Sequence, residues 1–153
     1  QTAAALFGPK CSGGLTPSAA LGLAVMTSID DILSLRSLYD RYNHGIDTGN
    51  GEMFAGCFTD DGSLNTLGEP IIGHALIAEF AETTHAGLSA MRHEATNIVI
   101  DVDGDSATGA AFLKAFMVPD HTMVITGRYD DEFRRTDDGW RIRSRLFTAD
   151  APA

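Results

Sequence analysis

Acid–base catalysis is the chemistry that the side chains of this sequence could support most directly. Imidazole is a natural general base near neutral pH, because its ordinary pKa of about 6.5 lies close to the operating pH. A carboxylate hydrogen-bonded to one ring nitrogen fixes the tautomer and stabilises the imidazolium that forms. The sequence contains five histidines, in neither HxxxH nor HxH spacing. We therefore expect no metal site.

Asp47 and His93 are the carboxylate and the histidine of greatest interest, and each also has a structural interpretation. Asp47 lies in the stretch Ile-Asp-Thr-Gly, where it could cap a following helix or form an Asx turn. His93 lies in the stretch Met-Arg-His-Glu, and a single histidine on a strand is more often structural than catalytic. Residue type alone leaves both interpretations open.

Tyrosines and arginines offer further polar groups. Tyr39 and Tyr42 are spaced to share the apolar face of one helix. A hydroxyl there could hydrogen-bond a developing enolate, or it could belong to a side chain that only packs in the core. Three arginines could reach an anionic group of a substrate, or could form a cross-strand charge ladder with the acidic residues 130–132; they are Arg128, Arg143 and Arg145.

The first half of the chain predicts three helices. Ser28 and Asp31 have the spacing of a capping box, and apolar residues then recur at helical spacing as far as Ile46. We expect a second, shorter helix over residues 50–58 and a third over residues 73–85. Between them, a turn at residues 60–62 and a short strand at residues 63–67 are expected.

The second half of the chain changes to the period of a strand. Alternation near residues 98–102 is followed by Asp103-Gly104, a strong hairpin signal. Residues 106–118 form a long apolar run that we expect to be buried on both faces, and two further alternating strands follow. Helices followed by antiparallel strands predict an α+β fold, and a strongly twisted sheet curls to leave a concave mouth that can bind ligands.

Residues 1–25 are rich in Ala, Gly, Ser, Thr and Pro and lack a basic segment ahead of a continuous apolar core. We interpret this stretch as a leader or upstream extension rather than a signal peptide. Residues 26–153 are then predicted to form one domain, which suits the length of the chain.

Charge and composition exclude several classes of partner. The net charge of −10 argues against unaided binding to nucleic acid or to anionic membranes. No apolar run approaches the roughly 20 residues needed to span a bilayer. Cys11 and Cys57 form neither a CxxC motif nor a disulfide framework, so we expect a cytoplasmic protein.

The order of motifs resembles the SnoaL-like, nuclear-transport-factor-2-like (NTF2-like) family. The motifs are LYDRYNHGID, FTDDG, a helix that contains Gly73, MRHEATN, a DGD hairpin and GRYDDEFRRTDDGWRI, and together they span residues 28–149. The branches of closest resemblance are the scytalone dehydratases, the hexachlorocyclohexane dehydrochlorinases and the bile-acid dehydratases. The resemblance implies a cone-shaped, curved antiparallel sheet with three N-terminal helices, a homodimer, and no metal or organic cofactor.

The resemblance also implies a site. Asp47 and His93 match the positions of a working Asp–His pair, and Tyr42 matches a tyrosine of some relatives. We expect the substrate to be bound by residues that share polar or aromatic character, namely Tyr39, Phe54, Asn97, Phe112, Phe116 and Tyr129. Two departures from the relatives stand out: residues 106–118 lack a further polar pocket residue, and Tyr42 replaces the dehydrochlorinase lysine.

These expectations define three functional hypotheses. The first is a cofactor-independent lyase, isomerase or cyclase in which His93 removes a proton from a hydrophobic, oxygenated small molecule. The second is a binding or interaction module without chemistry, because fold does not imply function. The third and weakest is an ancillary subunit of a ring-hydroxylating oxygenase, whose extra terminal segments this domain lacks.

Overall fold

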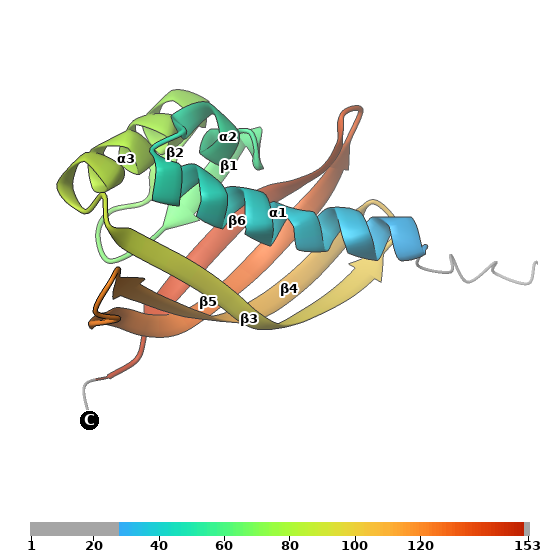
Figure 1. The fold of residues 1–153 in the computed structure, drawn as a ribbon. Helices are drawn as coiled ribbons and strands as arrows, with labels where there is room; N and C mark the ends of the chain where they lie inside the picture. Colours follow the sequence, from blue (N-terminus) through green and yellow to red (C-terminus); the bar gives the residue numbers. More distant parts are fainter. Residues whose placement is uncertain (1–27, 152–153) are drawn as a thin grey trace, which may run out of the picture.

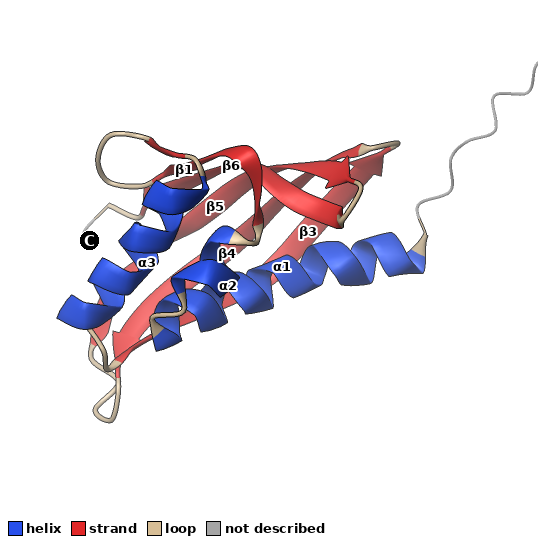
Figure 2. Ribbon diagram, turned by 90° about the horizontal axis from the view of Figure 1, so that it is seen from above, coloured by secondary structure: helices blue, strands red, loops and turns tan. Residues whose placement is uncertain are grey.

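One curved, unclosed sheet of six strands forms the framework of the fold, and three helices lie on one side of it (Figure 1; Figure 2). The computed structural model describes residues 28–151. The proposed leader at residues 1–25 and the domain boundary at residue 26 lie outside these residues. The predicted α+β class with a curved sheet is confirmed.

The elements follow one another in the order helix, helix, hairpin, helix and meander. The helices are α1 (Ile29–Thr48), α2 (Gly51–Ala55) and α3 (His74–Gly87). The strands are β1 (Phe58–Asn65), β2 (Ile71–Ile72), β3 (Met91–Asp103), β4 (Ser106–Met117), β5 (Met123–Thr136) and β6 (Gly139–Ala149). Their order in the sheet is β2-β1-β6-β5-β4-β3.

The first helix forms as its sequence predicts. The Ser28 hydroxyl accepts a hydrogen bond from the Asp31 backbone N–H at 3.1 Å, which satisfies one of the free donors at the helix start. Gly49 ends the helix in the left-handed conformation, with φ of 68°, a region that glycine enters without steric cost. The helix buries its apolar face from Leu35 to Ile46 and carries Asp47 in its last turn.

The segment after α2 differs from the prediction. Helix α2 ends at Ala55 instead of residue 58, and residues 60–62 lie inside β1 instead of forming a turn. The register of β1 on β6 shifts between Phe58 and Ser63, so this stretch is a bulge within a strand. β1 pairs with β6 in parallel, whereas β3 to β6 form the predicted antiparallel meander.

The prediction that residues 106–118 are buried on both faces is wrong. In β4 the side chains of Ala111, Leu113 and Ala115 are buried, and those between them are not. The helices cover the inner face of the sheet only (Figure 2). The apolar side chains on the outer face, among them Phe112, therefore face away from the core.

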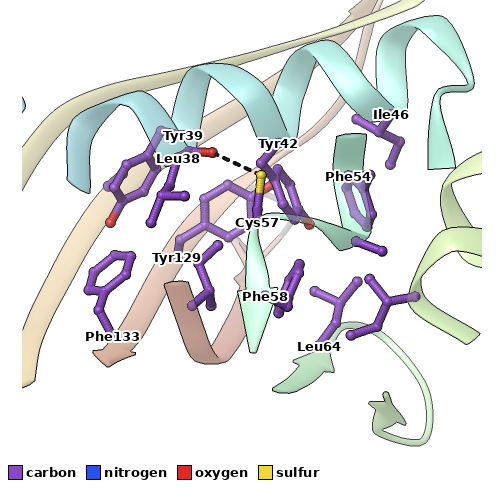
Figure 3. Packing of buried hydrophobic residues seen from close by; sticks show 14 of the residues in the cluster. Leu38, Tyr39, Tyr42, Ile46, Phe54, Cys57, Phe58, Leu64, Tyr129 and Phe133 are labelled. Atoms are coloured by element: carbon purple, nitrogen blue, oxygen red, sulfur yellow. Dashed lines mark hydrogen bonds between the residues drawn. The ribbon is translucent and has the colours of Figure 1, made fainter. Parts of the chain in front are cut away.

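The core lies between α1 and the inner face of the sheet and is rich in aromatic rings (Figure 3). Tyr42 packs against Phe54, with ring centroids 4.2 Å apart. Cys57 is fully buried, and its thiol lies 3.8 Å from the Leu38 carbonyl oxygen. Burial raises the pKa of this thiol to about 11, so Cys57 acts as a small core residue.

Asp31 links the start of α1 to the β5–β6 hairpin through contacts that depend on pH. Its Oδ1 lies 2.8 Å from Arg135 Nη1 and accepts a hydrogen bond from Trp140 Nε1 at 2.9 Å. These two contacts, that of Arg135 foremost, hold the pKa of the carboxyl well below its usual range. A lowered pKa contributes stability above the unfolded value of about 3.9, and this stability is lost as the pH falls below it.

The Asp31→Asn variant is therefore expected to be less stable than the wild type at neutral pH and to lose less stability on acidification below about pH 4. Urea unfolding at a series of pH values measures both effects. Asp30→Asn is the matched control, because Asp30 is exposed in the same turn. Parallel pH profiles for the wild type and Asp31→Asn would contradict the assignment.

Candidate functional site

The structure brings Asp47 and His93 together. His93 Nδ1 lies 2.6 Å from Asp47 Oδ1, and the His93 backbone N–H donates to Asp47 Oδ2 at 3.0 Å. The two side chains are 12% and 9% exposed. A carboxylate only accepts hydrogen bonds, so Nδ1 carries the proton of this bond. Nε2 is then the ring nitrogen that remains available to another molecule.

Two elements position this pair. Asp47 lies in the last turn of α1, and His93 is the third residue of β3, which runs beside that helix. The interpretation of Asp47 as a helix cap is wrong, because Asn50 caps α2 by accepting from the Met53 backbone N–H at 2.9 Å. Asp47 is therefore free to bind both the backbone and the ring of His93.

His93 borders an apolar cavity of about 370 Å³ between α1, α3 and the inner face of the sheet. Such a volume lies within the range of small-molecule sites. The lining residues contain no lysine, arginine, aspartate or glutamate, and they are Tyr42, Ile46, Thr66, Leu67, Phe80, Thr84, Leu88, Met91, His93, Leu113, Val124, Ile125, Tyr129 and Phe147.

Two tyrosines supply the phenolic hydroxyls of this cavity. Tyr42 and Tyr129 both line it and are both almost fully buried. Burial raises the pKa of each phenol above its ordinary value, so both stay protonated around neutral pH. A protonated phenol can donate a hydrogen bond to a carbonyl oxygen.

Tyr39, in contrast, does not line the cavity. Its ring packs edge-on against Phe133, with centroids 6.2 Å apart (Figure 3). Its hydroxyl reaches the backbone at Gly109, where an added Cβ would lie 2.7 Å from the Tyr39 oxygen. The structural interpretation of Tyr39 as a core residue therefore holds.

A buried ion pair contacts the rings of Tyr42 and Tyr129, the two tyrosines of the cavity. Arg145 Nε and Nη2 donate to the two carboxylate oxygens of Asp131 at 2.8 and 2.7 Å, and both side chains are 0% exposed. The guanidinium carbon lies 4.2 Å from the ring centroid of Tyr42 and 4.1 Å from that of Tyr129. These distances are those of cation–π contacts.

The charge state of Arg145 follows from two opposing effects. Burial opposes the charged form, but the Asp131 carboxylate outweighs it, so the pKa of the guanidinium is raised above its ordinary value. Arg145 therefore stays charged and faces the core. Arg145 does not line the apolar cavity. Its pairing with Asp131 across β5 and β6 fits the cross-strand charge ladder, which was one of the two interpretations of the sequence.

Several predicted substrate-binding residues do not line the cavity. Phe54 is fully buried behind Tyr42. Asn97 does not share a face with His93, because a register shift separates Thr96 from Val99 and places Asn97 at φ of 54° in a bulge. Phe112 is 57% exposed on the outer face, and Phe116 stacks on His121, with centroids 5.2 Å apart.

Other residues that line the cavity were not predicted from the sequence. For some of them, alternation along the strand indicates that the side chain faces inward. Leu113 and Phe147 alternate with exposed neighbours in β4 and β6. Met91 lies two residues before His93 and shares its face. Thr66 and Leu67 belong to the strand predicted over residues 63–67, but β1 ends at Asn65 and both lie in the following loop, where alternation does not apply.

A polar groove of about 650 Å³ lies between α1 and β3 and also borders the Asp47–His93 pair. Its lining includes Asp40, Asn43, His44 and Arg92, together with both members of the pair. His93 therefore lines both the apolar cavity and this polar groove.

Two further structural findings concern the described residues. Within residues 28–151, no three His, Cys, Asp or Glu side chains are placed so that they could hold a metal ion. None of the helices in this part of the chain is both long and apolar enough to cross a membrane.

Comparisons with known proteins agree with the fold. A family model described as the SnoaL-like domain matches residues 27–146. A Mycobacterium tuberculosis protein of unknown function is 33% identical, with a TM-score of 0.75 over 81% of this chain and 74% of that chain. An NTF2-like protein with a cystatin-like fold from Novosphingobium aromaticivorans is 27% identical, with a TM-score of 0.74 over 81% and 84% of the two chains.

A second protein of Novosphingobium aromaticivorans, described provisionally as an aromatic ring hydroxylase, is also similar. It is 30% identical to this chain, with a TM-score of 0.73 over 82% of this chain and 92% of that chain. Two of the three relatives therefore carry no stated activity, and the third carries a provisional one.

Proposed function

The chain belongs to the SnoaL-like domain family, and from this premise we propose that it is a cofactor-independent acid–base enzyme. The proposed reaction is an elimination, isomerisation or cyclisation of a hydrophobic, oxygenated small molecule. The observation that carries the proposal is the 2.6 Å contact of Asp47 with His93 Nδ1 at the wall of an apolar cavity. It leaves the basic Nε2 for the substrate.

The proposed roles follow from the contacts. His93 Nε2 removes a proton from the carbon next to a carbonyl group or from a hydroxyl, and Asp47 orients the ring and stabilises the imidazolium. Tyr42 donates a hydrogen bond to the oxygen that gains negative charge, with the ring of Tyr129 beside it at a centroid distance of 5.7 Å. His93 then returns the proton to the product or to a departing hydroxyl group.

A binding module without chemistry is the second candidate, because the same apolar cavity would hold a ligand whether or not His93 reacts with it. The two candidates differ in the fate of a proton. An enzyme of the proposed kind exchanges the proton next to a carbonyl, and a binding module does not.

In D₂O, the wild-type protein is expected to incorporate deuterium at the carbon next to the carbonyl of a bound phenyl alkyl ketone such as hexanophenone. His93 Nε2 would remove that proton, and Tyr42 and Tyr129, which line the same cavity, would donate hydrogen bonds to the enolate oxygen. Proton NMR of the recovered ketone measures the exchange. Binding of the ketone without exchange above the buffer rate would favour the binding module.

The homodimer and the cytoplasmic location implied by the sequence stay predictions. The same holds for the absence of a cofactor and for the boundary of the domain at residue 26. The aromatic ring hydroxylase description belongs to the Novosphingobium protein, and an ancillary role beside an oxygenase is the weakest of the three hypotheses for this chain.

A further inference from the structure

The exposure of the side chains that line the apolar cavity rises from its inner end to its mouth. At the inner end, Tyr42, Tyr129 and Leu113 are nearly fully buried. At the mouth, Leu67, Leu88 and Val124 line the same cavity but are 73%, 42% and 44% exposed. Large apolar side chains at a cavity rim therefore remain in contact with water.

The rim is built from three separate segments of the chain. Leu67 lies in the loop after β1, Leu88 lies between α3 and β3, and Val124 lies at the start of β5. Figure 1 shows these segments at the same end of the molecule, opposite the start of α1. Met123, also exposed, is the neighbour of Val124. Exposed apolar side chains are thus continuous with the cavity lining at its opening.

The imidazole and the two phenols of the cavity lie away from this rim, and the other polar side chains of the lining are Thr66 and Thr84. His93 and the hydroxyls of Tyr42 and Tyr129 belong to buried or nearly buried side chains. No residue of the lining carries a fixed charge. A carboxylate placed at the inner end would lose its hydration without gaining a permanent counter-charge. The inner end is therefore suited to an uncharged oxygenated group.

From this gradient we infer that the ligand is an uncharged amphiphile that is longer than the cavity. Its carbonyl or hydroxyl end meets His93 and Tyr42, and its apolar chain leaves through the mouth over Leu67, Leu88 and Val124. This inference rests on the proposed function for the identity of the oxygenated end. The chain-length dependence rests on the shape and lining of the cavity alone.

A series of phenyl alkyl ketones tests the inference. Affinity is expected to rise from propiophenone through hexanophenone to nonanophenone, by about twofold to fourfold for each added methylene, the upper figure being that for full burial. Phenylhexanoate, which has a charged end, is expected to bind at least about tenfold more weakly than hexanophenone above neutral pH. Calorimetric titration of the wild-type protein measures each affinity.

The double variant Leu67→Ser/Val124→Ser isolates the rim. It is expected to lower the affinity for nonanophenone severalfold and to leave that for propiophenone unchanged, because only the longer ketone reaches the mouth. Leu33→Ser is the matched control, since Leu33 is an exposed leucine of α1 outside the cavity lining. It should leave both affinities unchanged.

Three outcomes would overturn the inference. These are equal affinities along the ketone series, equal binding of phenylhexanoate and hexanophenone, or no binding of any ketone. The proposed function fails differently, because a ketone that binds with the expected length dependence but exchanges no proton would remove the chemistry and leave the binding inference intact.

Discussion

The Arg145→Met variant is expected to lose about 3–5 kcal/mol of the free energy of unfolding, because it leaves the Asp131 carboxylate buried without its partner. Both side chains are fully buried, and Arg145 occupies both carboxylate oxygens of Asp131. Small domains are stable by only about 5–15 kcal/mol. The urea midpoint is therefore expected to fall steeply.

Two further variants test whether burial of the ion pair causes this loss of stability. Arg128→Met removes the partner of Asp130, an ion pair of the same 2.7 Å length on the exposed face of the sheet, and is expected to cost less than about 1 kcal/mol. The double variant Arg145→Met/Asp131→Leu removes both buried charges and is expected to recover most of the lost stability. Arg145→Met within 1 kcal/mol of the wild type would contradict the assignment of a desolvated pair.

The His93→Gln variant is expected to slow deuterium exchange of a bound ketone by about 10²–10⁴-fold, the usual contribution of a positioned general base. Glutamine has a similar length and polarity but no basic nitrogen. The rate is measured by proton NMR at saturating ketone, so that a change in affinity does not mask it.

Glu94→Gln is the matched control for this variant. Glu94 is the next residue of β3. It pairs with Lys114 at 2.7 Å and lines the polar groove, but it does not line the apolar cavity that would hold the ketone. The Glu94→Gln variant should exchange deuterium into the ketone at the wild-type rate. Exchange by His93→Gln at the wild-type rate would remove His93 from the mechanism. The tautomer of the ring, read from nitrogen-15 shifts, tests Asp47 separately: in Asp47→Ala the proton should no longer be fixed on Nδ1.

The sequence predicts the helices and the meander well, because their signals are local. Ser28 marks the start of α1 and Gly49 its end, and Gly104 turns the β3–β4 hairpin with φ of 60°. Prediction from the sequence fails where the pairing of the strands departs from regular alternation. A bulge has no period of its own, so alternation places Arg145 and Asn97 on the wrong faces.

The case of Arg145 illustrates the physical reason. Simple alternation along β6 places Arg145 with Arg141 and Arg143 on the polar face. The register of β5 on β6 shifts between Glu132 and Phe133. The shift turns Arg145 inward to Asp131, and Leu146 outward. No feature of the single sequence distinguishes this arginine from its neighbours.

The candidate site was predictable only in part. The inward orientation of Tyr42 follows from helical spacing. The pairing of Asp47 with His93 joins residues 46 positions apart and was expected only because the motifs resemble a known family. Phe112 and Phe116 were expected in the pocket because β4 is apolar on both faces. Which face the helices cover is a property of the tertiary structure, and the strand itself does not encode it.

The position of the Asp47–His93 pair between two dissimilar spaces has a consequence for its hydration. His93 lines both the apolar cavity and the polar groove, whereas Asp47 lines only the groove. A ligand that fills the cavity therefore covers His93 from one space only and leaves the groove open to water. The Asp47 carboxylate thus keeps a hydrated neighbour whether or not the cavity is occupied.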